Sequence, residues 1–216
     1  MTLGQGYPRR ERLAAFVDLL LEANRRVNLT AARTPEAAWE HVADSLTLAP
    51  FVRGDLVDVG SGGGFPAIPL AIVCGVRVTL IEAIAKKAAF LRATLESLHL
   101  EGEVVTGRAE SLAHEPAYRE RFETATARAV ASAPAVLELT LPLLRIGGRA
   151  VLQRGRMDDA ERHAAESAAL MLGGAVSMEH SLDGERRLLI VEKGASTPQR
   201  FPRRVGVPER KPLCFT

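Results

Sequence analysis

The spacing of apolar residues predicts two helices in the first fifty positions. One face of residues 9–27 is apolar and the other is charged, which is typical of an amphipathic helix. Its apolar positions are Leu13, Phe16, Val17, Leu20 and Leu21. A second helix is expected from Pro35 to about Leu48, because Thr34 suits an N-cap and Pro35 and Glu36 suit a first turn. Residues 28–30 would form the turn between them.

From Leu56 onward, short apolar runs alternate with longer helical stretches, as in a parallel sheet with crossover helices. The predicted strands are 56–59, 76–81, 103–106, 123–127, 149–153, 175–180 and 187–192. The predicted helices between them are 66–73, 85–99, 134–144 and 158–172. Residues 182–185 have the composition of a hairpin turn, so the seventh strand should run antiparallel to its neighbour.

This order of elements predicts an α/β fold and resembles the Rossmann-like layout of class I methyltransferases, a seven-stranded mostly parallel sheet with an antiparallel last strand. We expect one domain over residues 1–216. Within it, residues 1–50 would form a helical N-terminal extension, 51–194 the core and 195–216 a basic, proline-rich tail.

Composition narrows the class of protein. The chain is 47% hydrophobic and 25% charged, and no run of 18 apolar residues lacks a charge, so no membrane span is expected. The N-terminus lacks the order of a secretory signal, and the two cysteines, Cys74 and Cys214, favour a reducing cytosol. The cysteines and five histidines have no paired ligand spacing, so we expect no metal site.

The net charge of +2 argues neither for nor against nucleic acid. Of the 28 basic residues, all but four lysines are arginine, which suits phosphate contacts but also fits a general compositional bias. From residue 193 onward the chain carries one acid, Glu209, among basic residues that could bind nucleic acid or simply face solvent. These are Lys193, Arg200, Arg203, Arg204, Arg210 and Lys211.

The most informative segment is a glycine loop that follows the first strand. Its pattern is D-x-G-x-G-x-G, running from Asp58 to Gly64. A dinucleotide-binding loop would need a third glycine where Phe65 stands, so that interpretation fails. The loop instead resembles that of S-adenosylmethionine-dependent methyltransferases. Glu82 lies 22 residues after Gly60, where a carboxylate can accept both hydroxyls of a ribose. The alternative is a tight turn without a ligand.

Two further segments follow predicted strands. Residues 107–110 could lie beside an adenine ring or simply begin a helix. Residues 126–131 would lie beside the target base. They lack the N-P-P-Y type of sequence found in exocyclic amine methyltransferases, and neither cysteine is placed for thiolate chemistry on a pyrimidine.

Taken together, these residues resemble the RsmG (GidB) family, which methylates N7 of a guanine in the decoding-site loop of 16S ribosomal RNA. The similarity runs through most of the chain. It includes Asn28-Leu29-Thr30, His41, Asp44-Ser45-Leu46, the segment 58–69, Glu82 with Lys86-Lys87, the segments 107–110 and 127–131, Gly147-Gly148, and Phe201-Pro202-Arg203-Arg204 followed by the segment 206–209.

The resemblance implies S-adenosyl-L-methionine as cofactor. Its implied contacts are Asp58, Gly60, Gly62, Gly64, Phe65, Glu82, Ala83, Ala109, Glu110 and Arg128. Candidates near the target base are Arg128, Asn28, His41 and Asp44, and candidates for RNA binding are Arg154, Arg203, Arg204, Arg210 and Lys211. The partner would be 16S ribosomal RNA or the small ribosomal subunit, and we expect a cytoplasmic monomer.

Three positions depart from the family pattern: Ala67 replaces a common glycine, Arg154 a usual lysine and Glu40 a frequent arginine. Guanine N7 has a free lone pair and no proton, so no acid or base is assigned and positioning should dominate. Phe65 or an arginine plane would be the stacking platform. Two alternatives stay open: a cofactor-binding ribosome-associated or regulatory module without methyl transfer, and a methyltransferase with another substrate.

Overall fold

The structure, a computed structural model, describes residues 7–128, 131–182 and 186–213. Its centre is a seven-stranded sheet in the order β3-β2-β1-β4-β5-β7-β6. The strands are β1 Leu56–Val59, β2 Val78–Glu82, β3 Gly102–Thr106, β4 Phe122–Arg128, β5 Leu144–Arg154, β6 Gly174–Ser181 and β7 Arg187–Lys193. The first five are mutually parallel, and β7 is antiparallel to both β5 and β6. The predicted sheet, with its antiparallel last strand, is confirmed.

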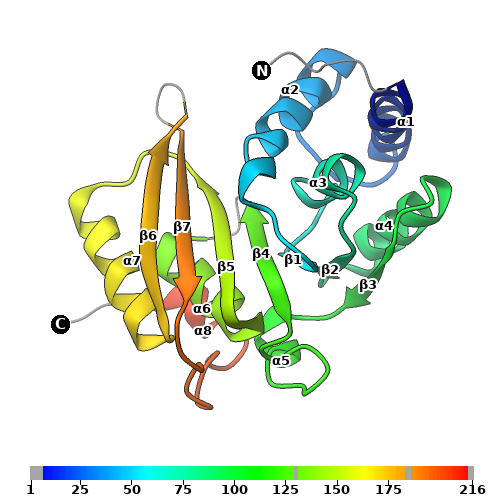
Figure 1. The fold of residues 1–216 in the computed structure, drawn as a ribbon. Helices are drawn as coiled ribbons and strands as arrows, with labels where there is room; N and C mark the ends of the chain where they lie inside the picture. The colour runs from blue at the N-terminus through cyan, green and yellow to red at the C-terminus, as the bar shows by residue number, and fades with distance from the viewer. Residues whose placement is uncertain (1–6, 129–130, 183–185, 214–216) are drawn as a thin grey trace.

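Helices cover both faces of this sheet (Figure 1). One group comprises α1 Tyr7–Asn24, α2 Pro35–Leu46, α3 Ala67–Cys74 and α4 Ala85–Ser97. The other comprises α5 Ala109–Leu112, α6 Ala133–Thr140, α7 Asp159–Met171 and α8 Val207–Arg210. Two short 3-10 helices, η1 Ala49–Phe51 and η2 Leu141–Leu143, precede β1 and β5.

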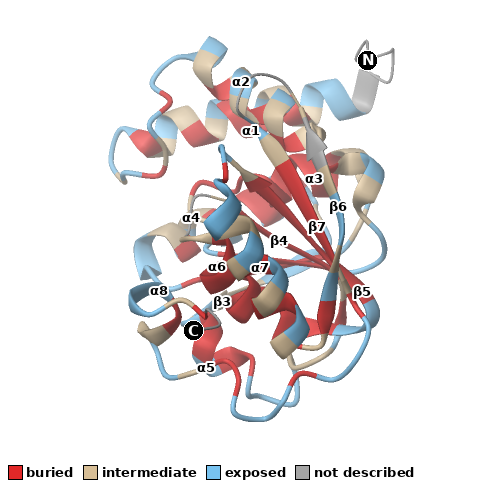
Figure 2. Cartoon of the chain, turned by 90° about the vertical axis from the view of Figure 1, so that its left-hand side faces the viewer, coloured by how far each residue is buried: buried red, intermediate tan, exposed pale blue. Residues whose placement is uncertain are grey.

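Each sheet face has its own apolar core, because successive strand residues point to opposite faces. In β7, Leu189 and Val191 pack in the core with α6 and α7, whereas Leu188 and Ile190 pack in the core with α1 to α4. The central strands are therefore buried on both sides, as Figure 2 shows, and their sequences are mostly apolar, with Asp58, Thr79 and Glu82 as buried polar exceptions in β1 and β2.

Several predicted boundaries were wrong, for local reasons. The helix expected over 134–144 ends at Thr140, because Pro142 has no N–H to continue it. Strand β5 begins at Leu144, five residues before the predicted start at 149, and includes the Gly147-Gly148 pair that weakened the strand pattern. The short helices α5 and α8 were not predicted as such. Of the expected hairpin turn 182–185, residues 183–185 lie outside the described residues.

The N-terminal helices are joined by a loop that one buried side chain organises. The Asn24 amide donates to the carbonyls of Thr30 at 3.0 Å and Ala32 at 2.9 Å. Its Oδ1 accepts from the backbone N–H groups of Leu29 at 2.9 Å and Thr30 at 3.1 Å. Helix α1 ends at Asn24 and not at the predicted residue 27, and the Asn24 side chain holds the loop that follows. The predicted N-cap is confirmed: Thr34 Oγ1 accepts from the N–H of Ala37 at 3.3 Å.

Within the described residues, no helix is both long enough and apolar enough to cross a membrane.

Replacing Asn24 by alanine should lower the free energy of unfolding by about 2–3 kcal/mol, since it leaves several buried backbone groups without partners. Urea denaturation followed by circular dichroism measures this change. Asn28→Ala, at an exposed position in the same loop, is the control and should change it little. Equal effects of the two substitutions would contradict the role given to Asn24.

Candidate functional site

The glycine loop lies directly after β1, at the carboxyl end of the central strands, where open α/β sheets bind their ligands. Gly60, Gly62 and Gly64 have φ angles of 72°, 51° and 91°, a backbone region that strains other residues. A Cβ placed on Gly62 would meet only the carbonyl oxygen of Gly60, 3.7 Å away. The backbone there is consequently accessible to a ligand.

Glu82 connects this loop to the end of β2. Its carboxylate is buried, and Oε2 accepts from the N–H of Gly62 at 2.9 Å while Oε1 accepts from the N–H of Ile84 at 2.8 Å. An ionised carboxylate offers about four acceptor positions. Glu82 therefore holds the loop and still has capacity to accept hydroxyl groups.

Asp58, in β1, is 1% exposed and lies behind the same loop. Its Oδ1 accepts from the Thr126 hydroxyl of β4 at 2.7 Å, while its Oδ2 is buried without a hydrogen-bond partner. Burial raises the pKa of this carboxyl to about 7, although the Thr126 hydroxyl acts in the opposite direction. A partly protonated carboxyl with one unsatisfied oxygen thus lies beside the glycine loop.

An ion-pair cluster joins α2 to the end of β4. The Arg128 guanidinium lies 4.8 Å from the centre of the Phe65 ring and places Nη1 3.6 Å from Oδ2 of Asp44. The other carboxylate oxygen, Oδ1, is 2.6 Å from Nη1 of Arg186. Asp44 therefore fixes the Arg128 plane over Phe65 and also links α2 to the segment before β7. The structure brings together Arg128, Asp44 and Phe65, all of which the sequence analysis named as site candidates.

His41 also packs against Phe65. Its ring meets the Phe65 ring edge-on at 5.4 Å, and Phe16 does the same at 5.2 Å. Burial, and next the Arg128 charge, lower the pKa of His41, so its imidazole is neutral near pH 7. Phe65 is buried under these groups. Of the two expected platforms, the Arg128 plane is therefore the more exposed.

Other predicted cofactor contacts lie at the ends of the neighbouring strands. Ala83 is exposed directly after Glu82, and Ala109 and Glu110 form the first turn of α5 after β3. Glu110 is buried and its Oε1 accepts from Nη2 of Arg108 at 3.2 Å and from the N–H of Gly206 at 2.8 Å. Asn28 is exposed in the loop before α2 and accepts from Arg33 at 3.3 Å.

Arg154, an RNA-binding candidate, is engaged with the segment that follows β4. It donates from Nη1 to the carbonyl of Ala131 at 2.5 Å and from Nη2 to Glu161 at 2.9 Å. Glu161 also accepts from the N–H of Ala133 at 2.9 Å. Glu161 could not be predicted from the sequence, because its partners come from β5 and from the start of α6. The ion pair of Arg154 and Glu161 therefore holds the backbone of Ala131 and Ala133, which follow β4 in the sequence.

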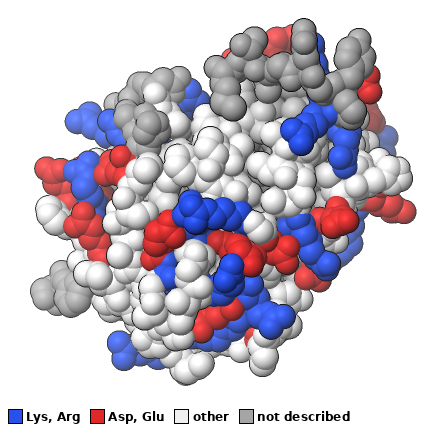
Figure 3. All heavy atoms as spheres, viewed as in Figure 1, with Lys and Arg blue, Asp and Glu red and all other residues white. Residues whose placement is uncertain are grey.

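The four C-terminal candidates for RNA binding differ in their exposure and in their contacts. Arg203 binds both oxygens of Glu138, which is fully buried in α6, through Nε at 2.8 Å and Nη2 at 2.6 Å. Its guanidinium therefore stabilises the fold. Arg204, Arg210 and Lys211 are exposed. On the face shown in Figure 3, Lys and Arg side chains lie among Asp and Glu side chains.

Two of the departures from the family pattern have simple surroundings. Ala67 is fully buried at the start of α3, and Glu40 is exposed on α2. Among residues 7–128, 131–182 and 186–213, no group of three His, Cys, Asp or Glu side chains could hold a metal.

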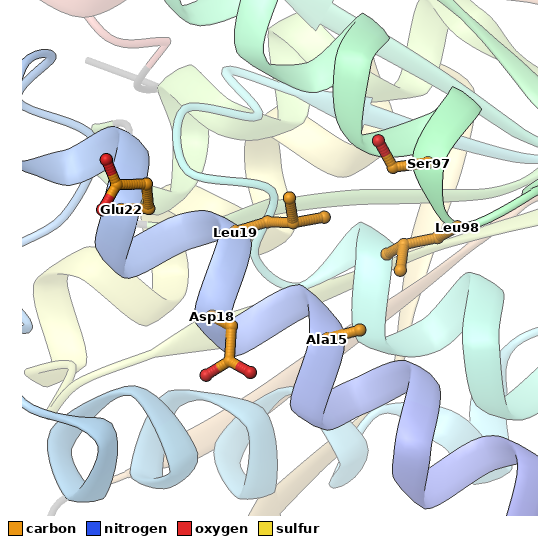
Figure 4. A pocket seen from close by; sticks show the side chains of 6 residues that line it. All are labelled: Ala15, Asp18, Leu19, Glu22, Ser97 and Leu98. Carbon is orange, nitrogen blue, oxygen red and sulfur yellow. The ribbon is translucent and has the colours of Figure 1, made fainter.

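A hollow between α1 and α4 includes none of the site residues described above (Figure 4). It is lined by Ala15, Asp18, Leu19, Glu22, Ser97 and Leu98.

Comparison with known proteins shows the family of the chain. The model of the GidB family, described as rRNA small subunit methyltransferase G, matches residues 9–190. The chain belongs to this family. A protein of Rubrobacter xylanophilus named ribosomal RNA small subunit methyltransferase G is 44% identical over 221 residues, covering 94% of this chain and 85% of that protein. A protein of Chloroflexus aggregans with the same name is 45% identical over 208 residues, covering 92% and 87%.

Solved structures support the fold. A branched-chain polyamine synthase from Thermus thermophilus superposes with a TM-score of 0.62 at 15% identity, covering 86% of this chain and 64% of that one. A T. thermophilus 16S rRNA methyltransferase in complex with AdoMet and guanosine gives 0.50 at 20% identity, covering 71% and 39%. The fold of this GidB-family chain is that of the class I methyltransferases, as predicted.

Because Asp58 is buried with a raised pKa, we expect the free energy of unfolding to depend on pH. Its folded-state pKa of about 7 exceeds the ordinary aspartate pKa of 3.8, so its contribution to folding is fully present below about pH 4 and is lost as pH rises through 7. Asp58→Asn should remove a decline on the order of 3 kcal/mol in the free energy of unfolding between pH 5 and 8. Urea titrations at each pH measure it, with the exposed Asp55→Asn as control. An unchanged pH slope in Asp58→Asn would contradict the assignment.

Proposed function

We propose that the chain transfers a methyl group from S-adenosylmethionine to N7 of a guanine in the decoding-site loop of 16S ribosomal RNA. The observation that carries the proposal is the pairing of Glu82 with the N–H of Gly62 at the carboxyl end of β1 and β2, in a member of the GidB family. This pairing places an acceptor carboxylate next to an accessible glycine backbone.

The residues present fit such a cofactor. Glu82 would accept the ribose hydroxyls, since its carboxylate has acceptor positions left beside those used by Gly62 and Ile84. The unpartnered Oδ2 of Asp58 and the open backbone at Gly62 would face the methionine part. Ala83, Ala109 and Glu110 would surround the adenine, and the glycine loop with the backbone of the buried Phe65 would complete the site. When bound, S-adenosylmethionine supplies a methyl group activated by its sulfonium charge.

The chain's own contribution to catalysis is positioning. Guanine N7 carries a lone pair and no proton, so no side chain has to remove one. Arg128, fixed by Asp44 and by the Phe65 ring, would offer its plane to the base. His41 stays neutral there and adds no second cation near the transferring methyl group.

The surrounding chain would bind the RNA. Arg154 and Glu161 would keep the segment after β4 in place, and the exposed Arg204, Arg210 and Lys211 would contact phosphates, with Asn28 on the side of the target base. Arg203 would act indirectly, by supporting the C-terminal segment. We propose that residues 1–216 form one domain and act as a cytoplasmic monomer.

Incubation of unmodified small ribosomal subunits with the protein and S-adenosylmethionine should produce 7-methylguanosine in 16S ribosomal RNA. Mass spectrometry of the digested nucleosides detects it, and the same assay on RNA stripped of ribosomal proteins shows which form is the substrate.

Arg128→Lys keeps the charge but loses the guanidinium plane, so the yield of 7-methylguanosine in the same assay should fall at least tenfold.

Binding of S-adenosylmethionine without methylated product would favour a ribosome-associated module over an enzyme. Turnover of a small molecule that is insensitive to salt would indicate another substrate, since RNA binding weakens steeply as salt rises.

A further inference from the structure

The C-terminal segment after β7 is bound to the body of the protein at several points. The Arg119 guanidinium, in the loop before β4, donates to the carbonyl of Thr197 at 2.7 Å and to that of Phe201 at 2.9 Å. The His114 ring lies 2.8 Å from the carbonyl of Pro202. Phe201 is buried in the core shared by α6 and α7. The segment is therefore a folded part of the protein, although its basic, proline-rich sequence resembles a tail.

Arg203 anchors the segment to α6. Besides its contacts with Glu138, its backbone N–H donates to the same carboxylate at 2.7 Å, and its Nη2 donates to the carbonyl of Lys211 at 2.7 Å. A fully buried carboxylate needs such compensation. The ion pair thus fixes both ends of the segment 203–211 against α6.

Between these two ends, Gly206 turns its backbone N–H toward Glu110. The donor lies 2.8 Å from Oε1, and Gly206 has a φ of 75°, which other residues rarely adopt. Burial alone would raise the pKa of Glu110, but the N–H groups of Gly206 and of Glu110 itself, with Arg108, lower it below its usual range. The charge of Glu110 is therefore supported by a residue 96 positions away along the chain.

Glu110 belongs to the same edge of the sheet as Glu82. Thr106, the last residue of β3, pairs in register with Glu82, and the N–H of Gly107 donates to the carbonyl of Glu82 at 3.1 Å. The turn that carries Glu110 thus begins against the residue expected to accept the ribose. A carboxylate in this place would accept hydrogen bonds from N–H donors of the adenine base attached to that ribose.

We propose that the C-terminal segment is part of the cofactor site, with Gly206 as the positioning residue that holds Glu110 toward the nucleoside of S-adenosylmethionine. This inference rests on the proposed function. It gives the C-terminal basic sequence a second role, distinct from contact with RNA.

The test is calorimetric titration with S-adenosylhomocysteine over a range of pH. Gly206→Pro removes the N–H and, because proline cannot adopt the positive φ of Gly206, also moves the turn away from Glu110, so binding should weaken about tenfold. It should also raise the pH at which affinity is lost on acidification, because Glu110 would then protonate more readily. A purely structural role would not move that midpoint.

Arg203→Lys tests the same link without changing Gly206. It keeps the positive charge but loses the two-pronged guanidinium contact with Glu138 that anchors the segment. It should weaken binding and shift the midpoint in the same direction, and it decides the question alone if Gly206→Pro does not fold. Arg149→Lys, in an ion pair with Glu192 between β5 and β7, is the matched control and should bind S-adenosylhomocysteine as the wild type does.

The outcomes separate the two claims. Wild-type protein that binds no S-adenosylhomocysteine would overturn the proposed function itself. If the wild type binds and Gly206→Pro, or Arg203→Lys in its place, has equal affinity or the same midpoint, the proposed function stands and the inference about the C-terminal segment fails.

Discussion

The architecture of the site depends on the cost of burying carboxylates at one edge of a sheet. Asp58, Glu82 and Glu110 lie on or after β1, β2 and β3, and all three are buried. A buried carboxylate is tolerated only where donors compensate the water it has lost. Most of these donors belong to the backbone or to a hydroxyl group: the N–H groups of Gly62 and Ile84 for Glu82, the Thr126 hydroxyl for Asp58 and the N–H of Gly206 for Glu110.

Compensation of these charges joins parts of the chain that are distant in sequence. Glu82 fixes the glycine loop, and Asp44 draws α2 toward Arg128 at the end of β4. The same requirement brings the C-terminal segment to Glu110 and Glu138. Asp58 is the exception, since one of its oxygens has no partner in the protein. An incompletely satisfied acid beside an accessible glycine backbone is a suitable place for a polar or cationic ligand.

Features that depend on a few neighbouring residues could be predicted from the sequence. The glycine loop, the Thr34 cap and the alternation of strands and helices follow from spacing over a few residues, and the structure has all of them. Features that depend on long-range partners could not be predicted. Glu161 looked like an ordinary surface acid of a helix, and the Gly206 N–H has no sequence signal pointing to Glu110. Helix α6 was predicted too long because Leu141 to Leu144 continue its apolar pattern past the point where Pro142 ends it.

The central claim is that Glu82 serves the glycine loop and the cofactor together. Calorimetric titration of S-adenosylhomocysteine into the wild type and into Glu82→Ala tests it most directly. We predict measurable binding by the wild type and a loss of about 1–3 kcal/mol in the variant, the range for hydrogen bonds to a charged group. Equal affinities of the two proteins, with the variant folded, would contradict this account.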